Sequence, residues 1–270
     1  MGIHRAEAAQ RAFSLDRPND DPKKEVASLH QIGVGLLEAG LVDEAESAND
    51  RTIRICQERG LTQSRRYAAA LDVRARIAAT RGEIDAARRH YAEALALMKS
   101  LGDEHEAILI RINMGELEYR AGRFARALEF ADAALAAARR VHSRHREITA
   151  LANLAAYRIA LSDIEGARSS AREALVLSQW APPLEISAAI QHLATVAALS
   201  GDCAGAARLC GYVDAWYNSE GCTRELTERH GYDILMKTLR TALRDSEIAA
   251  LAAQGAAFSE EHAVAQALAV

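Results

Sequence analysis

GLVDEA at residues 40–45 decides the fold, because four more copies of its pattern follow at nearly constant spacing. The others are GEIDAA at 82–87, GRFARA at 122–127, SDIEGA at 162–167 and GDCAGA at 201–206. Each copy begins with Gly or Ser and has an alanine five positions later, and successive copies start 42, 40, 40 and 39 residues apart. Self-similarity at this period predicts a helical solenoid, whose stacked helix pairs offer an extended binding surface.

The composition of the 270-residue chain indicates an all-α protein. It is 50% hydrophobic, only 5% aromatic and contains four prolines, and alanine, leucine, arginine and glutamate, all strong helix formers, dominate it. The net charge of −4 lacks the basic surplus of a dedicated nucleic-acid binder. No apolar run approaches a membrane span, and four cysteines are too few for a disulfide scaffold. We therefore expect a reduced, cytoplasmic protein that binds neither nucleic acid nor membrane.

The repeats divide the chain into helix pairs, each with a helix A, a turn and a helix B. We expect five repeats over residues 24–217, preceded by a partial repeat helix and a loop at 1–23 and followed by a C-terminal helical cap at 218–270. The repeats are expected at 24–60, 65–102, 104–142, 145–180 and 184–217. An isolated half repeat would leave an uncapped apolar edge, so we expect the chain to be the C-terminal part of a longer polypeptide.

The small residues inside each repeat carry a family resemblance. Seven positions before each turn Gly or Ser stands Gly33, Ala75, Gly115, Ala155 or Ala194. With the invariant alanine after the turn, this pattern resembles tetratricopeptide repeats of the longer bacterial type. The resemblance implies a right-handed α-α superhelix in which small residues let helices A and B approach closely.

The C-terminal cap carries a second resemblance. The segments 206–211, 232–240 and 255–264 look similar to the C-terminal ends of large bacterial signal-transducing ATPases. In that family a superhelix of tetratricopeptide repeats follows an ATPase core, so the resemblance implies a sensor and effector-binding segment. Within the cap we expect Thr223 and Ser259 to begin helices as N-caps.

Sequence motifs for catalysis or for a cofactor are missing. The chain has no phosphate-binding Gly-x-x-x-x-Gly-Lys-Ser/Thr loop, no Gly-x-Ser-x-Gly elbow and no His-Glu-x-x-His pair. Cys203, Cys210 and Cys222 lack the close spacing of a zinc site and are expected to be buried thiols. We therefore predict a protein that is not an enzyme and that uses no metal or cofactor.

Candidate partner-binding residues follow from the family resemblance, which places four positions of helix A on the concave surface. These residues are His30, Gln31, Asp72, Arg76, Asn113, Glu116, Tyr119, Asn153, Gln191, His192 and Thr195. Asn113 and Asn153 share a position in adjacent repeats, where an amide could pair with a peptide backbone or satisfy only local backbone groups. Arg65-Arg66, by contrast, is expected on a solvated outer face.

The resemblance also limits the class of partner. Basic residues that clamp a C-terminal carboxylate in chaperone-binding relatives are absent from the second position of each repeat, which holds Ala27, Ala69, Leu109, Thr149 and Ala188. We predict a non-catalytic interaction or sensor module that binds a protein segment or small effector in its groove. The alternative is a homo-oligomerising scaffold that associates through its N-terminal edge or its C-terminal helices.

Overall fold

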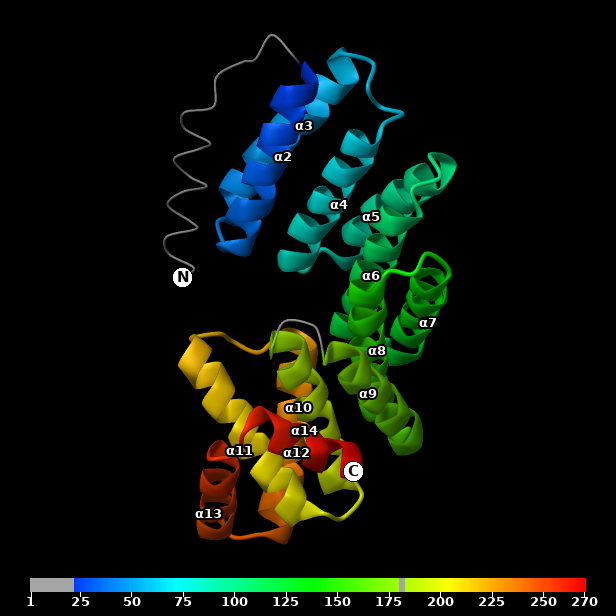
Figure 1. Cartoon of the computed structure of the whole chain (residues 1–270). Coiled ribbons are helices and arrows are strands. Elements are labelled where there is room, and N and C mark those ends of the chain that lie inside the picture. Colours follow the sequence, from blue (N-terminus) through cyan, green and yellow to red (C-terminus); the bar gives the residue numbers. More distant parts are fainter. Residues whose placement is uncertain (1–21, 180–182) are drawn as a thin grey trace. The chain divides into compact units, whose positions relative to one another are not determined.

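The computed structural model describes residues 22–179 and 183–270, and this part of the chain forms thirteen helices and no strand (Figure 1). It divides into two compact units, Met1–Leu117 and Glu118–Val270, which are considered separately. The expected helix within residues 1–23 lies, up to residue 21, outside the described residues. Within the described ranges, no helix is long and apolar enough to span a membrane.

The first unit is a run of antiparallel helix pairs. Helices α2 (Pro22–Glu38) and α3 (Val42–Glu58) form one pair, and α4 (Arg65–Thr80) and α5 (Ile84–Ser100) form the next. Helix α6 (Glu104–Arg120) begins a third pair. Because α4 packs against both helices of the preceding pair, α2 and α4 lie next to each other.

The recurrent turn ends helix A in a left-handed residue. The backbone φ of Gly40 is 78°, and its amide donates to the carbonyl of Leu37, while the amide of Leu41 donates to Leu36. These two bonds satisfy carbonyls that the helix end leaves open. Glycine adopts positive φ without a steric penalty, which explains why it recurs at this position. Ser162 is the exception among the five turns, and its φ is 61°.

The alanine after each turn closes the interface between helix A and helix B. All five alanines are fully buried: Ala45, Ala87, Ala127, Ala167 and Ala206. A Cβ atom on Gly33 would lie 3.7 Å from the carbonyl oxygen of Ala45, so these two helices already approach closely. The predicted fold, an all-α solenoid of helix pairs with small residues at the contacts, is confirmed.

The second unit continues the same pattern after the end of α6. Helix α7 (Phe124–Arg140) packs on α8 (Arg144–Ala160), and α8 pairs with α9 (Ile164–Ser178). Helix α10 (Pro183–Leu199) then pairs with α11 (Cys203–Glu220). Helix α11 runs three residues beyond its predicted end, until Gly221 terminates it with a φ of 62°.

Three further helices complete the second unit. Helix α12 (Leu226–Ala242) packs against α10 and α8, α13 (Asp245–Ala256) lies along α11, and α14 (Glu260–Ala269) contacts α9, α10 and α11 (Figure 1).

The N-caps of these helices test two expectations from the sequence. Ser259 caps α14 as expected, since its hydroxyl accepts from the amide of His262. The expectation for Thr223 is wrong, because α12 begins after Glu225, whose amide donates to the carboxylate of Glu228 at 2.9 Å. That reciprocal bond is half of a capping box and fixes the helix start two residues later.

Candidate partner-binding site

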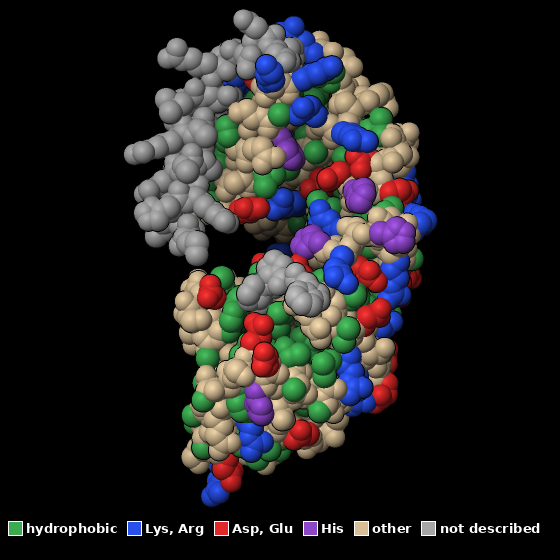
Figure 2. Space-filling view, in the orientation of Figure 1, with side chains coloured by type: hydrophobic (Ala, Val, Ile, Leu, Met, Phe, Trp, Pro, Cys, Tyr) green, Lys and Arg blue, Asp and Glu red, His purple; other side chains and the backbone are tan. Residues whose placement is uncertain are grey.

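An open groove lies on the helix-A side of the first unit. It has a volume of about 450 Å³. Helices α2 and α4, the end of α5 and the start of α6 contribute its lining: Ala27, His30, Gln31, Arg65, Arg66, Ala69, Met98, Asp103 and Glu106. Two of these, His30 and Gln31, are sequence-predicted site residues. In Figure 2, blue Lys and Arg side chains and a purple His side chain are visible on this unit.

His30 is the half-buried polar centre of this groove. Its Nδ1 atom is buried and has no hydrogen-bond partner among the described residues. Burial, and then the nearby guanidinium groups of Arg76 and Arg66, lower the pKa of His30, so the imidazole is neutral at pH 7. A neutral ring with one unused nitrogen can exchange a hydrogen bond with a bound backbone or side chain.

The groove has an apolar floor and a charged rim. Met98 is 1% exposed and forms part of the floor, with the half-buried methyl groups of Ala27 and Ala69 beside it. On the rim, the guanidinium of Arg65 donates to Asp103 over 2.9 Å. The expectation that Arg65-Arg66 lies on an outer face is wrong, because both side chains line the groove. These arginines stand at the start of α4, and sequence periodicity alone does not fix which way a helix end faces.

Two predicted residues of the first unit meet in a polar contact between neighbouring helix pairs. Asn113 of α6 donates from Nδ2 to the carboxylate of Asp72 on α4 at 3.0 Å. Asp72 is only 8% exposed, so this bond satisfies a buried charge. Asn113 is half-buried, whereas Glu116, one turn further along α6, is exposed. The Asn113 amide therefore serves the seam between repeats through a carboxylate, not through a local backbone group.

In the second unit, α12 covers the corresponding side of α8 and α10. Three predicted residues of α10 lie beneath it, and Gln191, His192 and Thr195 are at most 1% exposed. The Thr195 hydroxyl donates to the carbonyl of Gly231 on α12 at 3.3 Å, and also to the carbonyl of Gln191 at 3.0 Å. While α12 is in place, these side chains are inaccessible to a partner.

Polar contacts near its N-terminal end fix α12 in this position. Before its first turn, Arg224 donates to the side-chain oxygen of Gln191 at 2.9 Å. Further along, His230 shares a hydrogen bond with the hydroxyl of Tyr119, a predicted site residue that is 5% exposed. The rings of Tyr119 and Tyr157 stack with their centroids 5.0 Å apart. Tyr119 is therefore part of the packing around α12.

Small and apolar residues of α12 allow it to pack closely on α10. A Cβ on Gly231 would lie 3.8 Å from Thr195 and 3.9 Å from the ring nitrogen of His192, so α12 approaches α10 closely there. Leu235 and Leu239 are fully buried. The apolar face of this helix is visible in the sequence, but the surface on which it packs is not. The remaining predicted residue, Asn153 of α8, is 7% exposed.

The helix pairs described above match a known protein family. A family model described as "Tetratricopeptide repeat" matches residues 25–100 and 106–178, more than half of the chain. The chain is a tetratricopeptide repeat protein. A search of curated proteins found no significant match to this sequence.

Solved structures share the fold of this tetratricopeptide repeat protein at low sequence identity. BtubC from P. vanneervenii is 19% identical, with a TM-score of 0.67 over 83% of this chain and 94% of that one. A signal transduction ATPase with numerous domains and a tetratricopeptide repeat sensor, from Pyrococcus horikoshii, is 13% identical, with a TM-score of 0.65 over 88% of this chain and 37% of that one. Pseudomonas aeruginosa PilF is 17% identical, with a TM-score of 0.51 over 86% and 99%. At these identities the likeness shows the fold alone.

In the described part of the chain, no group of three or more His, Cys, Asp and Glu side chains could hold a metal ion. Of the three C-terminal thiols expected to be buried, Cys210 is buried, Cys203 is half-buried and Cys222 is exposed. Burial and the nearby Asp214 carboxylate raise the pKa of Cys210 to about 12, so it remains a thiol at pH 7.

Proposed function

We propose that this protein is a non-catalytic interaction module that holds a segment of a partner protein in the groove over α2, α4 and α6. The observation that carries the proposal is the contrast between the two units. The groove of the first unit is open and has an unsatisfied ring nitrogen on His30, whereas α12 covers the helix-A side of the second. Tetratricopeptide repeats commonly act as scaffolds for protein interaction, which supports the same use here.

We further propose that the module belongs to a cytoplasmic signalling or transcriptional regulator and passes the bound state to an attached ATPase. The resemblance of the C-terminal helices to those of signal-transducing ATPases supports this role. The shared fold of a signal transduction ATPase whose sensor is a tetratricopeptide repeat is consistent with it. In such an arrangement α12 would restrict binding to the first unit.

Filling the groove tests the binding site. Ala69 is half-buried in the groove lining, and Ala69→Trp would occupy the space that a partner needs. Ala92→Trp adds the same side chain at an exposed position of α5 outside the groove and is the matched control. The probe is a displayed library of twelve-residue peptides, selected on the wild-type full chain, with binding of individual peptides measured by fluorescence anisotropy.

We expect selected peptides to bind the wild type and Ala92→Trp equally and to bind Ala69→Trp at least about tenfold more weakly, because the tryptophan removes the apolar contact. Thermal unfolding of all three proteins establishes that they are folded. If no selected peptide loses affinity for Ala69→Trp, or if selection yields no binder, the groove is not the site of interaction.

A further inference from the structure

A second pocket, distinct from the groove, lies among α3, α4 and α5 of the first unit. Its volume is about 200 Å³, and it shares no lining residue with the groove. Ligand pockets commonly measure about 300–1,000 Å³, so the space here suits a small metabolite and not a protein segment. The polar groups of the pocket indicate the chemistry that such a molecule needs.

The lining residues recur at helical spacing, so the pocket is a slot that runs along the helices. Glu83, the N-cap of α5, and His90 are seven residues apart, which is about 10 Å of helix rise. Because α4 and α5 are antiparallel, Glu83 lies near the end of α4, and His90 lies close enough to Arg74 for that charge to influence its titration. Over the same length, one face of α4 lines the slot through residues three, four and seven positions apart: Arg74, Ile77, Ala78 and Arg81.

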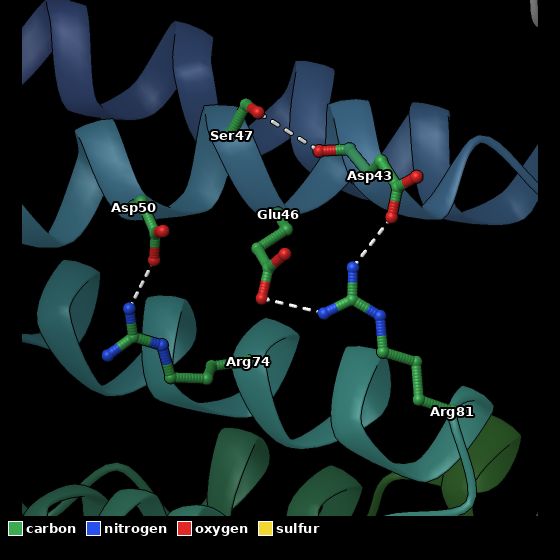
Figure 3. Close-up of polar contacts among 6 residues, drawn as sticks. All are labelled: Asp43, Glu46, Ser47, Asp50, Arg74 and Arg81. Carbon is green, nitrogen blue, oxygen red and sulfur yellow. Dashed lines mark hydrogen bonds and ion pairs between the residues drawn. The ribbon is translucent and has the colours of Figure 1, made fainter.

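Ion pairs between α3 and α4 neutralise both arginines of the slot. In Figure 3, the guanidinium of Arg81 contacts Asp43 at 2.7 Å and Glu46 at 2.8 Å. The guanidinium of Arg74 contacts Asp50 in the same way. These bonds use one oxygen each of Glu46 and Asp50, and the second oxygen of each carboxylate has no partner among the described residues. Both arginines are therefore already paired, while acceptor oxygens remain available.

The side chain of Asn49 on α3 also lacks a partner. It lines the slot and is only 3% exposed, yet it makes no hydrogen bond with any residue in 22–179 or 183–270. Leaving a buried amide without a hydrogen bond costs about 1–3 kcal/mol, so a ligand that bonds to it gains affinity. The carboxylate of Glu83 is exposed, does not cap α5 and has no ion pair in the same ranges.

His90 contributes an acceptor without adding positive charge. Burial, and then the guanidinium of Arg74, lower the pKa of His90, so the imidazole is neutral at pH 7 and one ring nitrogen can accept a hydrogen bond. The two guanidinium groups then face four carboxylates, a surplus of two negative charges: Asp43, Glu46, Asp50 and Glu83.

From this arrangement we infer that the slot binds a short aliphatic diamine, a dication whose charge equals the surplus. One ammonium group donates charge-assisted hydrogen bonds to Glu83 and to the free oxygen of Glu46. The other donates to the free oxygen of Asp50 and to the ring of His90 at the opposite end. Each cation thus meets a carboxylate that the protein itself leaves partly unused.

The middle of the slot fits the carbon chain of a diamine. Ile77 and Ala78 lie between the two charged ends of α4 and are 3% and 6% exposed, so methylene groups can cover them. Asn49 follows Glu46 by one helical turn, and its amide oxygen accepts a further hydrogen bond from the ligand.

Other small ligands fit this slot less well. The carboxylates are divided between its two ends, and no group of three His, Cys, Asp or Glu in the described part of the chain could hold a metal ion. An anion meets a net negative charge. A monoamine leaves one end of the slot without a cation. The inference goes beyond the proposed function, because the slot is separate from the groove.

The test measures binding of three molecules with the same four-carbon chain to the full-length protein. They are 1,4-diaminobutane, butylamine and 1,4-butanediol, which differ in the number of terminal ammonium groups able to form charge-assisted hydrogen bonds. Isothermal titration calorimetry at pH 7 and low salt gives the affinities. The NMR signal of the Asn49 side-chain amide, assigned by its loss in Asn49→Ala, reports where the ligand binds.

Three variants separate the slot from general charge effects. Glu83→Gln removes one carboxylate of the slot with little change in shape. Glu58→Gln is the matched control, because Glu58 is exposed at the end of α3, lies outside the lining and changes the net charge equally. Ala69→Trp, which fills the groove, distinguishes the two sites. Thermal unfolding establishes that each variant is folded.

We expect 1,4-diaminobutane to bind the wild type at least about tenfold more tightly than butylamine, and butanediol not to bind measurably. Glu83→Gln weakens the diamine at least about tenfold, whereas Glu58→Gln and Ala69→Trp bind it as the wild type does. The diamine also shifts the Asn49 amide signal.

The inference is overturned if the diamine does not bind, if it binds no more tightly than butylamine, or if the two glutamate variants lose affinity equally. Loss of diamine binding in Ala69→Trp, or an unshifted Asn49 signal, would place the ligand elsewhere and overturns it too. Peptide binding in the groove does not depend on these outcomes, so the proposed function is tested separately.

Discussion

At the scale of single residues, two glycines allow the backbones of α11 and α13 to approach closely. A Cβ on Gly255 of α13 would lie 1.7 Å from the carbonyl oxygen of Arg208 on α11, and one on Gly211 would lie 2.1 Å from that of Ala252. Backbone atoms cannot rotate away as a side chain can, so any larger residue must push the two helices apart. Glycine inside a helix costs about 1 kcal/mol relative to alanine, and here the close backbone contact offsets that cost.

Gly255→Ala should therefore lower the free energy of unfolding by about 2 kcal/mol or more, the range typical of overpacking. Urea denaturation followed by circular dichroism measures the change. Gly33→Ala is the control, because it also lies inside a helix but its Cβ would meet its neighbours at 3.7 and 3.8 Å. We expect that variant to be neutral or more stable by up to about 1 kcal/mol. Equal losses in the two variants would contradict the argument.

Ser162 offers the opposite change, because it occupies a left-handed turn position where the other four repeats have glycine. Its φ of 61° is unfavourable for a residue with a Cβ atom. Ser162→Gly should stabilise the protein by about 0.5–1 kcal/mol, measured by the shift of its urea midpoint. Ser169→Gly makes the same substitution at an exposed position inside α9 and should destabilise by about 0.5 kcal/mol or more. A loss of stability in both variants would show that the turn carries no strain.

His192 makes stability depend on pH. It is buried beneath α12, and burial lowers its pKa to about 4 from an ordinary value of 6.5. In the unfolded chain the imidazole binds a proton as pH falls below 6.5, whereas in the folded protein it stays neutral until about pH 4. The unfolded state therefore gains protons first, and stability falls across this window.

Replacing His192 by glutamine removes this effect. Between pH 7 and pH 5, the wild type should lose about 2 kcal/mol more of its unfolding free energy than His192→Gln does. Denaturant titrations at the two pH values measure the difference, and the contribution of His30 is common to both proteins. Parallel losses would mean that His192 is accessible to solvent in the folded state.

At the scale of secondary-structure elements, α12 makes the two units different. It lies in the C-terminal cap, beyond the repeats, and packs on the helix-A side of α8 and α10. Leu235 and Leu239 of this helix are fully buried, whereas Leu226 at its start is 38% exposed. The packing of α12 therefore depends on these two leucines and on the polar contacts of Arg224 and His230.

Leu235→Ala should weaken the packing of α12 and lower the free energy of unfolding by about 3 kcal/mol, because the shorter side chain leaves a cavity beneath the helix. Leu226→Ala should cost less than about 1 kcal/mol, since that side chain is already partly exposed. A second readout tests the position of α12 directly. As the helix opens, the pKa of His192, followed by NMR, should rise toward 6.5 in Leu235→Ala and stay low in Leu226→Ala. An unchanged pKa in both would show that other contacts keep the site closed.

How far the sequence predicts the structure also differs between elements. Gly40 and Ala45 specify a turn and a close helix contact through local geometry, so the repeat pattern alone predicts α2 to α11. The position of α12 depends on contacts such as Thr195 to Gly231, which join residues distant in the sequence and leave no periodic signal. The predicted outer-face position of Arg66 is wrong for a related reason, since a residue in the first turn of a helix can face either side of a solenoid.

At the scale of the whole molecule, a solenoid transmits little stress along its length. Each repeat contacts its neighbours, so stability is the sum of local terms and nearest-neighbour interfaces. The division of this chain into two compact units fits that description. A substitution in one unit should then change local opening in that unit more than in the other.

Hydrogen exchange measured by mass spectrometry shows whether a substitution destabilises one unit or the whole chain. Gly255→Ala should raise the exchange of amides in α11, α12 and α13 and leave α2 to α5 nearly unchanged, because the strained contact lies entirely within the second unit. Ala69→Trp, placed in the first unit, supplies the reciprocal case. If Gly255→Ala instead raises exchange equally along the chain, the two units unfold as one, and α12 would then stabilise the binding groove as well as its own unit.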